Sequence, residues 1–596
     1  MKEGFIVKIL ITTLNSKFIH SSLSIRYLKS YVKNEFPDIE IQEYTINQNI
    51  DYIVGDIFKR NVDIVAFSCY IWNIEHILHI SEALKLVNPN IKIILGGPEV
   101  SFDGEEIIRN NSFIDFIIYG EGEETFKELL IKLKNKADNY KSIKGLIFQK
   151  NEKVYVTEPR PLIQNLDTIP SPFEDDLEDL KNKIVYFESS RGCPFNCRFC
   201  LSSTIKGVRF FSIERVKRDL KRLIDAKVKQ VKFVDRTFNA RKDYALEIMN
   251  FIVEQNVSNI NFHFEVTAHL LDEDILNFLQ NVPRGLFQFE IGVQSTNPQT
   301  LEAIDRVTNI EKLKNVVTRI KSYNNIHQHL DLIAGLPYED LNSFKKSFNE
   351  IYSLRPEKLQ LGFLKLLKGS ELRNKKDLYG FKFLNKPPYE VLENNYIKYK
   401  DILKLKGIED LVEKYGNEFY FENSLSYIMN NFYKSPFEFY ESFAEYWERK
   451  GLSNESHGRI DLYRILLDFY EENINRNVKL FKDILRFDFI CNTKSPTIPE
   501  FLKNSNEDIP KQMKHNFLKK REILGRYLPK YLDLPTKKIV NEVYIEKFNY
   551  DILKIIEKNY RLEEATLCHT YILFYYDDAN GCCFFQVTEE FLQGER

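Results

Sequence analysis

Tryptophan, methionine and cysteine are scarce in this sequence, and long hydrophobic runs are missing. Among 596 residues there are 2 Trp, 4 Met and 8 Cys. The most apolar stretch, residues 64–72, has the length of a strand and is shorter than the roughly 18 residues that a membrane-spanning helix needs. No cleavable secretion signal precedes the first strand-like run. We therefore expect a cytoplasmic protein with no membrane partner and with reduced cysteines.

A surplus of charge of one sign is missing as well. The formal net charge is −2, so the overall charge does not favour nucleic acid or an anionic membrane as a partner. Hydrophobic residues make up 43% of the chain and charged residues 29%, which is typical of folded globular proteins. Because the chain is too long for one hydrophobic core, we expect several domains.

Short apolar runs alternate with amphipathic, helix-length segments in the first part of the chain. This alternation predicts parallel βαβ units and hence an α/β, Rossmann-like (flavodoxin-like) domain at residues 1–140. Glycines follow two of the strand-like runs, where a doubly wound sheet places its ligand loops. An ordinary Rossmann-like domain with tight turns fits the same pattern. The alternation is clearest in the expected strands 7–13, 64–68 and 91–95 and in the expected helices 21–34 and 74–87.

Residues 141–183 differ in character, because they contain four prolines and the acidic run 174–179. Proline fixes φ and interrupts regular structure, so we expect a linker here. A second alternating region, residues 184–370, predicts six parallel strands with crossover helices, which is a partial TIM-like (β/α)6 barrel. The expected strands are 184–188, 230–234, 261–266, 287–293, 329–334 and 358–363.

The last part of the chain, residues 371–596, is rich in aromatic, Lys and Glu residues and predicts a mostly helical domain. Helical periodicity is present at 389–405, 437–449 and 460–476. A terminal hairpin is expected from two apolar runs, 571–576 and 582–585, that flank a turn at 577–581.

Three cysteines in the segment SSRGCPFNCRFCLSS are closely spaced. Cys193, Cys197 and Cys200 are separated by three and two residues, so one tight loop directs three thiolates at a single centre. Electron-transfer clusters usually receive four protein thiolates, so three indicate a [4Fe–4S] cluster with one iron open to an external ligand. Zinc is the alternative. It needs a fourth ligand, and the following LSSTIKGVRFF contains no Cys, His, Asp or Glu.

This CxxxCxxC loop resembles the cysteine loop of the radical S-adenosylmethionine (radical SAM) superfamily. In that superfamily, S-adenosylmethionine chelates the open iron, and its reductive cleavage yields a 5′-deoxyadenosyl radical. The resemblance extends through the segments VDRTF, EIGVQS and DLIAGLPYE of the barrel. It implies cofactor-binding roles for Asp235, Glu290, Gln294 and Gly335, with Asp235 standing where family members often have Gly-Gly-Glu.

Each of these barrel residues also has a structural interpretation. Glu290 and Gln294 fit polar pairing inside a barrel, and Gly335 fits a simple turn. Period-two alternation places His263 and Glu265 on one face of the third strand, the face that points inward if the pattern is a barrel.

The first domain resembles the cobalamin-binding domain that is often fused upstream of radical SAM barrels. The resemblance implies that glycine loops approach the corrin closely. The D-x-H-x-x-G loop that supplies an axial histidine in methionine-synthase-type domains is missing; His20 is the alternative ligand, and we favour no protein axial ligand. A degenerate domain that has lost cobalamin is a second alternative. The implied cobalamin-binding residues are Ser68, Trp72, Asn73, Gly96, Gly97, Gly120 and Gly122.

The C-terminal region resembles a domain of unknown function, DUF4080, found in one branch of these proteins. It therefore identifies no substrate. Cys582 and Cys583 are adjacent, so they point to opposite faces of a strand, which favours packing or exposure over a redox or metal-binding pair.

Together, these features predict an oxygen-sensitive radical SAM enzyme with a [4Fe–4S] cluster, S-adenosylmethionine and cobalamin. The reaction implied by the resemblance is methyl transfer to an unactivated carbon of an unidentified substrate, with a flavodoxin- or ferredoxin-type electron donor. One alternative is a non-methylating radical SAM enzyme, catalysing cyclisation or rearrangement with a degenerate cobalamin domain. Another is a non-catalytic, cluster-binding sensory protein.

Overall fold

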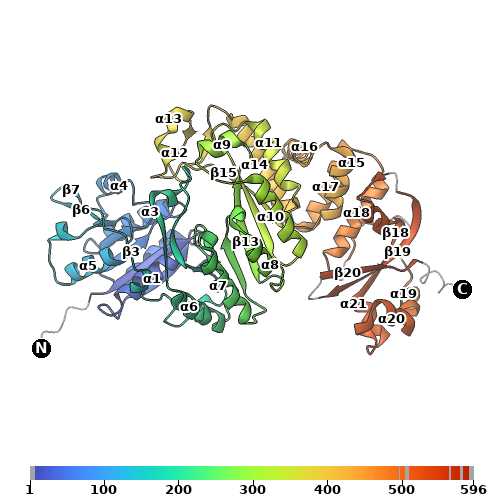
Figure 1. Ribbon diagram of the computed structural model, residues 1–596, viewed down its shortest axis with the longest axis horizontal. Coiled ribbons are helices and arrows are strands. Elements are labelled where there is room, and N and C mark those ends of the chain that lie inside the picture. The colour runs from blue at the N-terminus through green and yellow to red at the C-terminus, as the bar shows by residue number, and fades with distance from the viewer. Residues whose placement is uncertain (1–6, 495–496, 504–508, 563–564, 578–580, 589–596) are drawn as a thin grey trace. The chain divides into compact units, whose positions relative to one another are not determined.

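The computed structural model describes residues 7–494, 497–503, 509–562, 565–577 and 581–588. The chain forms two compact units, Met1–Ile402 and Leu403–Arg596 (Figure 1).

The first unit opens with a seven-stranded sheet in the order β2-β1-β3-β4-β5-β6-β7. Its first five strands are parallel, as predicted, because helices return the chain between them. Two hydrophobic clusters cover the two faces: α2, α3 and α4 pack on one and α1 and α5 on the other. The elements are β1 (Ile9–Asn15), α1 (Leu23–Val32), β2 (Glu40–Thr45), α2 (Ile50–Lys59), β3 (Ile64–Ser68), α3 (Ile74–Val87), β4 (Lys92–Gly96), α4 (Gly104–Asn110), β5 (Phe116–Ile118) and α5 (Glu123–Lys134).

The sheet continues into the segment that the prolines assigned to a linker. β6 (Leu146–Lys150) pairs antiparallel with β5, and β7 (Lys153–Val156) pairs antiparallel with β6, so β5 does not end the sheet with unpaired backbone groups. From 157 to 183 the chain has only two 3-10 turns, Leu166–Thr168 and Glu178–Leu180.

The acidic run of this segment lies against α1. Lys29 pairs with Asp175 at 3.1 Å and Lys33 with Glu174 at 3.2 Å. These contacts hold the proline-rich segment against the first sheet's helices.

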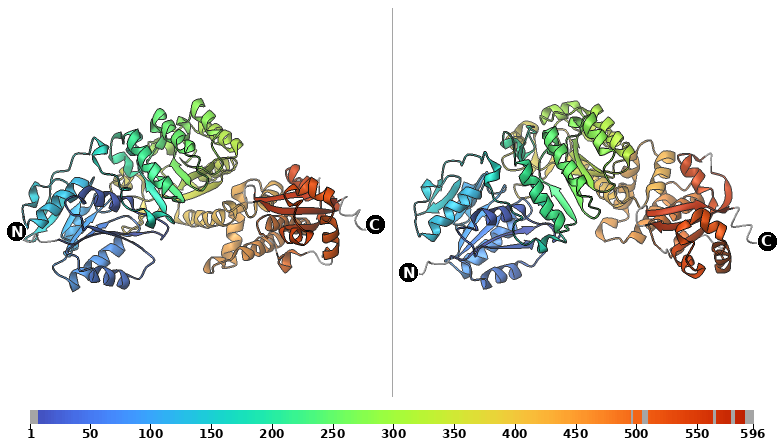
Figure 2. Two further views of the ribbon diagram at one scale, coloured as in Figure 1. Left: turned by 90° about the horizontal axis from the view of Figure 1, so that it is seen from below. Right: turned by 60° about the horizontal axis from the view of Figure 1, so that its bottom comes forward.

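Six parallel strands form the second sheet, in the order β15-β14-β13-β12-β11-β8. All six expected strands are present, and the predicted α/β class is confirmed. In β13 the burial alternates strictly, so one set of side chains packs under the covering helices and the other set faces the interior of the partial barrel. Figures 1 and 2 show this sheet together with its helices. The elements are β8 (Ile184–Phe187), α6 (Ile213–Asp225), β11 (Gln230–Phe233), α7 (Lys242–Glu254), β12 (Asn261–Glu265), α8 (Glu273–Leu279), β13 (Phe287–Gln294), α9 (Pro298–Ala303), α10 (Ile310–Tyr323), β14 (His327–Ala334), α11 (Leu341–Tyr352) and β15 (Lys358–Phe363).

The predicted start of the helix at residues 389–405 is wrong. Val391–Glu393 is β17, which pairs with β16 (Lys382–Phe383), and the helix α14 starts only at Tyr399. The Asn394 side chain accepts hydrogen bonds from the backbone N–H groups of Tyr396 and Ile397, and this turn separates strand from helix. Two short helices, α12 (Glu371–Asn374) and α13 (Lys376–Tyr379), precede β16.

The second unit is mostly helical and ends in an antiparallel sheet in the order β18-β19-β20. The predicted terminal hairpin is present as β19 (Leu567–Asp577) and β20 (Gly581–Gln586), and turn positions 578–580 lie outside the described residues. Sequence analysis missed β18 (Val543–Tyr550), which pairs along β19. Helix α14 (Tyr399–Leu411) begins in the last residues of the first unit and continues into the second. The other helices are α15 (Glu422–Phe432), α16 (Pro436–Arg449), α17 (Arg459–Asn473), α18 (Val478–Cys491), α19 (Lys511–Leu518), α20 (Arg521–Tyr527), α21 (Thr536–Glu542) and α22 (Ile552–Glu557).

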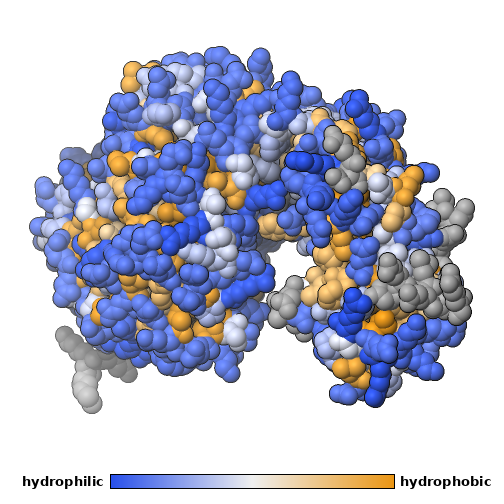
Figure 3. All heavy atoms as spheres, turned by 45° about the vertical axis from the view of Figure 1, so that its right-hand side comes forward, coloured by the Kyte–Doolittle hydropathy of each residue, from blue (hydrophilic) through white to orange (hydrophobic). Residues whose placement is uncertain are grey.

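The molecular surface mixes polar and apolar residues. Hydrophilic residues dominate the face drawn in Figure 3, and the hydrophobic ones are scattered between them, as is usual for globular proteins. In the part of the chain that the structure describes, no helix combines the length and the apolar character that crossing a membrane requires.

Candidate cluster and cobalamin sites

A short hairpin carries the three cysteines. Its strands are β9 (Ser190–Cys193) and β10 (Gly207–Phe210), which are antiparallel and place Cys193 opposite Gly207. Gly192 has φ +104°, and a Cβ atom there would lie 2.1 Å from the carbonyl oxygen of Gly207. Only glycine permits this approach, and it allows the chain to turn from β9 into the loop that holds Cys197 and Cys200.

Each cysteine thiol has a polar neighbour. The Cys197 side chain is buried, and Nη1 of Arg306 lies 3.6 Å from its Sγ. The backbone N–H of Ser202 donates to Cys200 Sγ at 3.4 Å. Burial raises the pKa of the Cys197 thiol, Arg306 opposes that rise, and the two other cysteines add to it. The three thiols are therefore close enough to influence one another.

The donor set fits a cluster better than a single ion. Among the described residues, no three His, Cys, Asp or Glu side chains gather as ligands of one metal ion, and the three cysteines are no exception. A four-iron cluster binds each cysteine through a different iron, so its sulfurs lie further apart than they do around one ion. Three cysteine ligands would leave one iron of such a cluster open to an external ligand.

Asp235 has protein partners that sequence analysis did not anticipate. Its carboxylate accepts hydrogen bonds from Ser189 N at 3.0 Å, from Ser189 Oγ at 2.6 Å and from Ser190 Oγ at 2.5 Å. Burial raises the pKa of Asp235, and the Ser189 hydrogen bonds oppose that rise. Asp235 therefore holds the start of β9 in place, and its oxygens face serines of its own chain.

Glu290 lies inside the barrel, where its carboxylate contacts a lysine and a histidine. Its Oε2 is 2.9 Å from Lys232 Nζ and 2.9 Å from His263 Nε2. Burial raises the pKa of Glu290, but His263 and Lys232 outweigh that effect and lower it to about 2. The residue is a carboxylate that already has cationic and imidazole partners.

Strand β14 adds polar residues to the same part of the barrel: Asp331, which begins the DLIAGLPYE segment, and two histidines that sequence analysis missed. His329 Nε2 lies 3.1 Å from His327 Nε2 and 3.1 Å from Gln288 Nε2. Burial raises the pKa of Asp331 to about 8, with help from the charges of Glu290 and Glu265. The period-two spacing of HQHLD was the available signal, the same signal that singled out His263 and Glu265.

Gln294 and Gly335 lie at the carboxyl ends of neighbouring strands. Gln294 follows a β-bulge, has φ +71°, and its buried Oε1 has no hydrogen-bond partner. Gly335 has φ +91°. Arg306 connects this end of β13 to the cysteine loop, since its Nη2 donates to the carbonyl of Gly292 at 2.5 Å. A bulge and an orphaned amide oxygen are features of a strand end shaped for a ligand.

Asn73 and Trp72 organise the edge of the first sheet after β3. The buried Asn73 amide donates to Thr13 Oγ1 at 3.2 Å, to Leu14 O at 3.0 Å and to the carbonyl of Ser68 at 3.2 Å. The Trp72 indole donates to Leu14 O at 3.1 Å yet stays 43% exposed. Its ring therefore presents an accessible aromatic surface.

The four predicted glycines lie on the same edge of the sheet, at the carboxyl ends of β4 and β5. Gly97 has φ +106°, and a Cβ atom there would lie 2.6 Å from the carbonyl of Cys69. Gly120 has φ +79°, with no heavy atom within 4 Å of a Cβ built on it. Gly96 ends β4, and Gly122 directly precedes α5. The structure thus brings the predicted cobalamin-binding residues to one edge.

His20 contacts the barrel. Its Nδ1 lies 2.9 Å from the Tyr186 hydroxyl, and its backbone bridges to Ile184 of β8. Burial lowers the pKa of His20, and Lys17 and Lys232 lower it further. One ring nitrogen is therefore already engaged with a barrel side chain.

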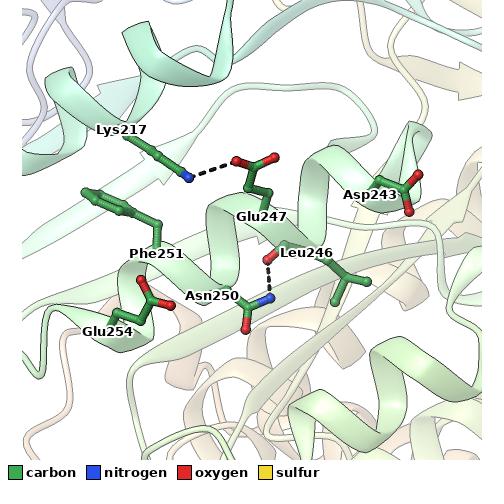
Figure 4. A pocket seen from close by; sticks show the side chains of 7 residues that line it. All are labelled: Lys217, Asp243, Leu246, Glu247, Asn250, Phe251 and Glu254. Carbon is green, nitrogen blue, oxygen red and sulfur yellow. Dashed lines mark hydrogen bonds and ion pairs between the residues drawn. The ribbon is translucent and has the colours of Figure 1, made fainter.

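An open hollow of about 400 Å³ lies on the outside of the barrel, over α6 and α7 (Figure 4). Lys217 spans it to Glu247 at 2.8 Å. None of the predicted site residues lines it. The lining residues are Lys217, Asp243, Leu246, Glu247, Asn250, Phe251 and Glu254.

Three families match successive parts of the chain. Residues 9–130 match the B12 binding domain, residues 187–351 match the radical SAM superfamily, and residues 377–574 match a protein family of unknown function, DUF4080. The chain therefore combines a cobalamin-binding domain with a radical SAM domain.

Similar proteins include methyltransferases. The uncharacterized methyltransferase PH0819 of Pyrococcus horikoshii is 32% identical over 325 residues, which are 53% of this chain and 70% of that protein. The cobalamin-dependent radical SAM methyltransferase TokK of Streptomyces tokunonensis is 25% identical over 55% of this chain and 50% of its own length. The chain thus spans only about half of TokK.

Solved structures share the fold. The cobalamin-dependent S-adenosylmethionine radical enzyme OxsB, with aqua-cobalamin and S-adenosylmethionine bound, covers 80% of this chain and 78% of its own at a TM-score of 0.57 and 15% identity. The radical S-adenosylmethionine methyltransferase TsrM of Kitasatospora setae covers 64% of this chain and 78% of its own at a TM-score of 0.54 and 14% identity.

The chain belongs to the cobalamin-binding radical SAM enzymes, in the branch that carries a C-terminal DUF4080 domain. Its cofactors, as the two domains imply, are a [4Fe–4S] cluster, S-adenosylmethionine and cobalamin.

Proposed function

We propose that this enzyme transfers a methyl group to an unactivated carbon of its substrate. Two similar proteins named as methyltransferases support the proposal. The structural observation that carries it is the presence, within one compact unit, of the cysteine hairpin and of the glycine-bearing edge of the first sheet. When bound, the three cofactors supply the carbon radical and the methyl group.

The chain's own residues hold and orient the reactants. Cys193, Cys197 and Cys200 would hold the cluster, and Arg306 fixes the loop by contacting both Cys197 and the end of β13. The glycines after β4 and β5 would admit the corrin, with the exposed Trp72 ring beside them. Exclusion of water from the barrel interior would protect a radical from side reactions.

We also propose that a small flavodoxin- or ferredoxin-type protein delivers the electron. The required potential is low, and such proteins supply electrons in that range.

The experiment uses anaerobically reconstituted full-length protein with S-adenosylmethionine, cobalamin and a chemical reductant. The wild type should release 5′-deoxyadenosine and S-adenosylhomocysteine, the second through remethylation of cobalamin. The combined change Cys193→Ala, Cys197→Ala and Cys200→Ala should abolish 5′-deoxyadenosine, because it removes the cluster ligands. The exposed Cys568→Ala is the matched control and should leave both products unchanged.

The same assay distinguishes the alternatives. Surviving 5′-deoxyadenosine in the triple variant would contradict the cluster assignment. Release of 5′-deoxyadenosine without bound corrin or S-adenosylhomocysteine would favour the non-methylating enzyme. Absence of both products from the wild type would favour a sensory protein.

A further inference from the structure

Two arginines on the cysteine hairpin reach acidic residues of the cobalamin domain. Arg191 on β9 and Arg209 on β10 face each other across the hairpin. Arg209 Nη2 lies 2.7 Å from Glu121 Oε1, and its Nη1 lies 3.1 Å from Glu121 Oε2. Arg191 Nη2 lies 2.7 Å from Glu123 Oε1, and its Nη1 lies 3.4 Å from Glu121 Oε1. Both acids belong to the Gly-Glu-Gly-Glu segment that follows β5.

This ion-pair network is largely buried. The Arg191 and Glu121 side chains are each 12% exposed. Arg191 also pairs with Glu188 at 3.0 Å, directly after β8. Burial raises the pKa of Glu121, but Arg209 and the backbone of Ile163 outweigh it, so the pKa of Glu121 lies below its ordinary value. The acidic and basic groups of the network are therefore paired with one another, and they lie between the two domains of this unit.

These contacts restrict the position of the cysteine hairpin relative to the cobalamin domain more than they stabilise the fold. A buried ion pair gains little net free energy, because desolvation offsets the attraction between the charges. A two-pronged arginine–carboxylate contact, however, fixes an angle as well as a distance. Glu121 is flanked by Gly120 and Gly122, while Arg191 stands two residues before Cys193.

The hairpin is held from its other side as well. Asp235, which follows β11, binds Ser189 and Ser190 at the start of β9. The barrel thus holds the hairpin through Asp235, and the cobalamin domain holds it through Glu121 and Glu123.

We propose that Glu121, through its contacts with Arg209 and Arg191, is a positioning residue that sets the distance and orientation between the cluster and cobalamin. The inference rests on the binding of both cofactors, which family membership provides, and it goes beyond the proposed methyl transfer. Glu121 touches no reacting atom; it acts through the hairpin that carries Cys193.

Pulsed electron paramagnetic resonance tests the proposal without a substrate. The reduced cluster and cob(II)alamin are both paramagnetic, so the spectrum of the full-length, doubly loaded protein reports the distribution of distances between them. Glu121→Gln keeps the side-chain shape and removes the charge. We expect it to bind both cofactors at wild-type stoichiometry and to give a broader distance distribution. Arg209→Gln, which removes the partner from the hairpin side, should broaden it in the same way.

The matched control is Glu128→Gln, on helix α5, which begins two residues after Glu121. Glu128 also pairs with an arginine, Arg160, at 2.8 Å, but its side chain is 47% exposed. This variant should keep the wild-type distribution.

An unchanged distribution in both Glu121→Gln and Arg209→Gln would overturn the proposal. Loss of either cofactor from both variants would overturn it too, since the residues would then serve binding rather than position. Neither result depends on turnover, so the methyl-transfer proposal stands or fails separately.

Discussion

At the scale of single residues, the barrel interior concentrates buried titratable groups. Burial lowers the pKa of His329 to about 3, and the charges of His327 and His263 add to this effect. The folded state therefore keeps His329 neutral, whereas the unfolded chain binds a proton at an ordinary histidine pKa of roughly 6.5. The free energy of unfolding must fall as the pH drops below that value, since only the unfolded state gains the proton.

We expect His329→Gln to weaken this acid sensitivity. The glutamine amide stays neutral in the folded and the unfolded state. The free energy of unfolding of the variant should therefore depend less steeply on pH, by about 1.4 kcal/mol per pH unit below roughly pH 6. Urea unfolding between pH 7 and pH 5, with proteolytic detection of β14 peptides, measures the slope. The exposed His79→Gln is the control for loss of an imidazole. Equal slopes for wild type and His329→Gln would show that His329 is not held neutral.

At the scale of elements, the hairpin β9–β10 depends on a close backbone contact. A Cβ atom at Gly192 would lie 2.1 Å from the carbonyl oxygen of Gly207, whereas a Cβ at Gly207 would meet no heavy atom within 4 Å. Both glycines have positive φ, so an alanine at either position is strained by about 1–3 kcal/mol. Only the change at Gly192 also forces the two strands apart.

Gly192→Ala should therefore lose most of its bound iron and sulfide after anaerobic reconstitution. Gly207→Ala should keep its cluster with a modest loss of stability. Iron and sulfide analysis, together with visible absorption, checks both variants. A fully loaded Gly192→Ala would mean that the cysteine loop forms without the paired hairpin.

At the scale of the whole molecule, the two compact units have separate cores. In the second unit Arg486 is fully buried, and it pairs with Asp483 at 2.8 Å and with Glu546 at 3.2 Å. Its guanidinium also lies 4.9 Å from the centre of the Phe548 ring. These contacts connect α18 to β18 inside the unit.

Arg486→Met should destabilise the second unit by about 3–5 kcal/mol, because it leaves buried carboxylates without their cation. Calorimetry should show a lower transition temperature for residues 403–596, and the absorption of the bound cluster in the first unit should be unchanged. A simultaneous loss of the cluster would show that the two units unfold as one.

Local patterns in the sequence predicted the cysteine loop and most strands of the two sheets in the first unit. Three cysteines on one short loop, six strand-length apolar runs and glycines after strands are properties of neighbouring residues, and spacing alone reveals them. The missed and misjudged elements lack such a signal. β6 and β7 lie in a segment whose prolines indicate a linker, and the helix predicted from Tyr389 is interrupted by the Asn394 turn.

The sequence by itself determined the cysteine loop, the α/β class and the resemblance that led to the cofactors. Only the tertiary structure decided which groups meet: Asp235 with the serines that begin β9, Glu290 with Lys232 and His263, and Glu121 with Arg209. The physical reason is that these partners lie tens of residues apart along the chain, so no periodicity connects them. Folding alone places them within hydrogen-bonding distance.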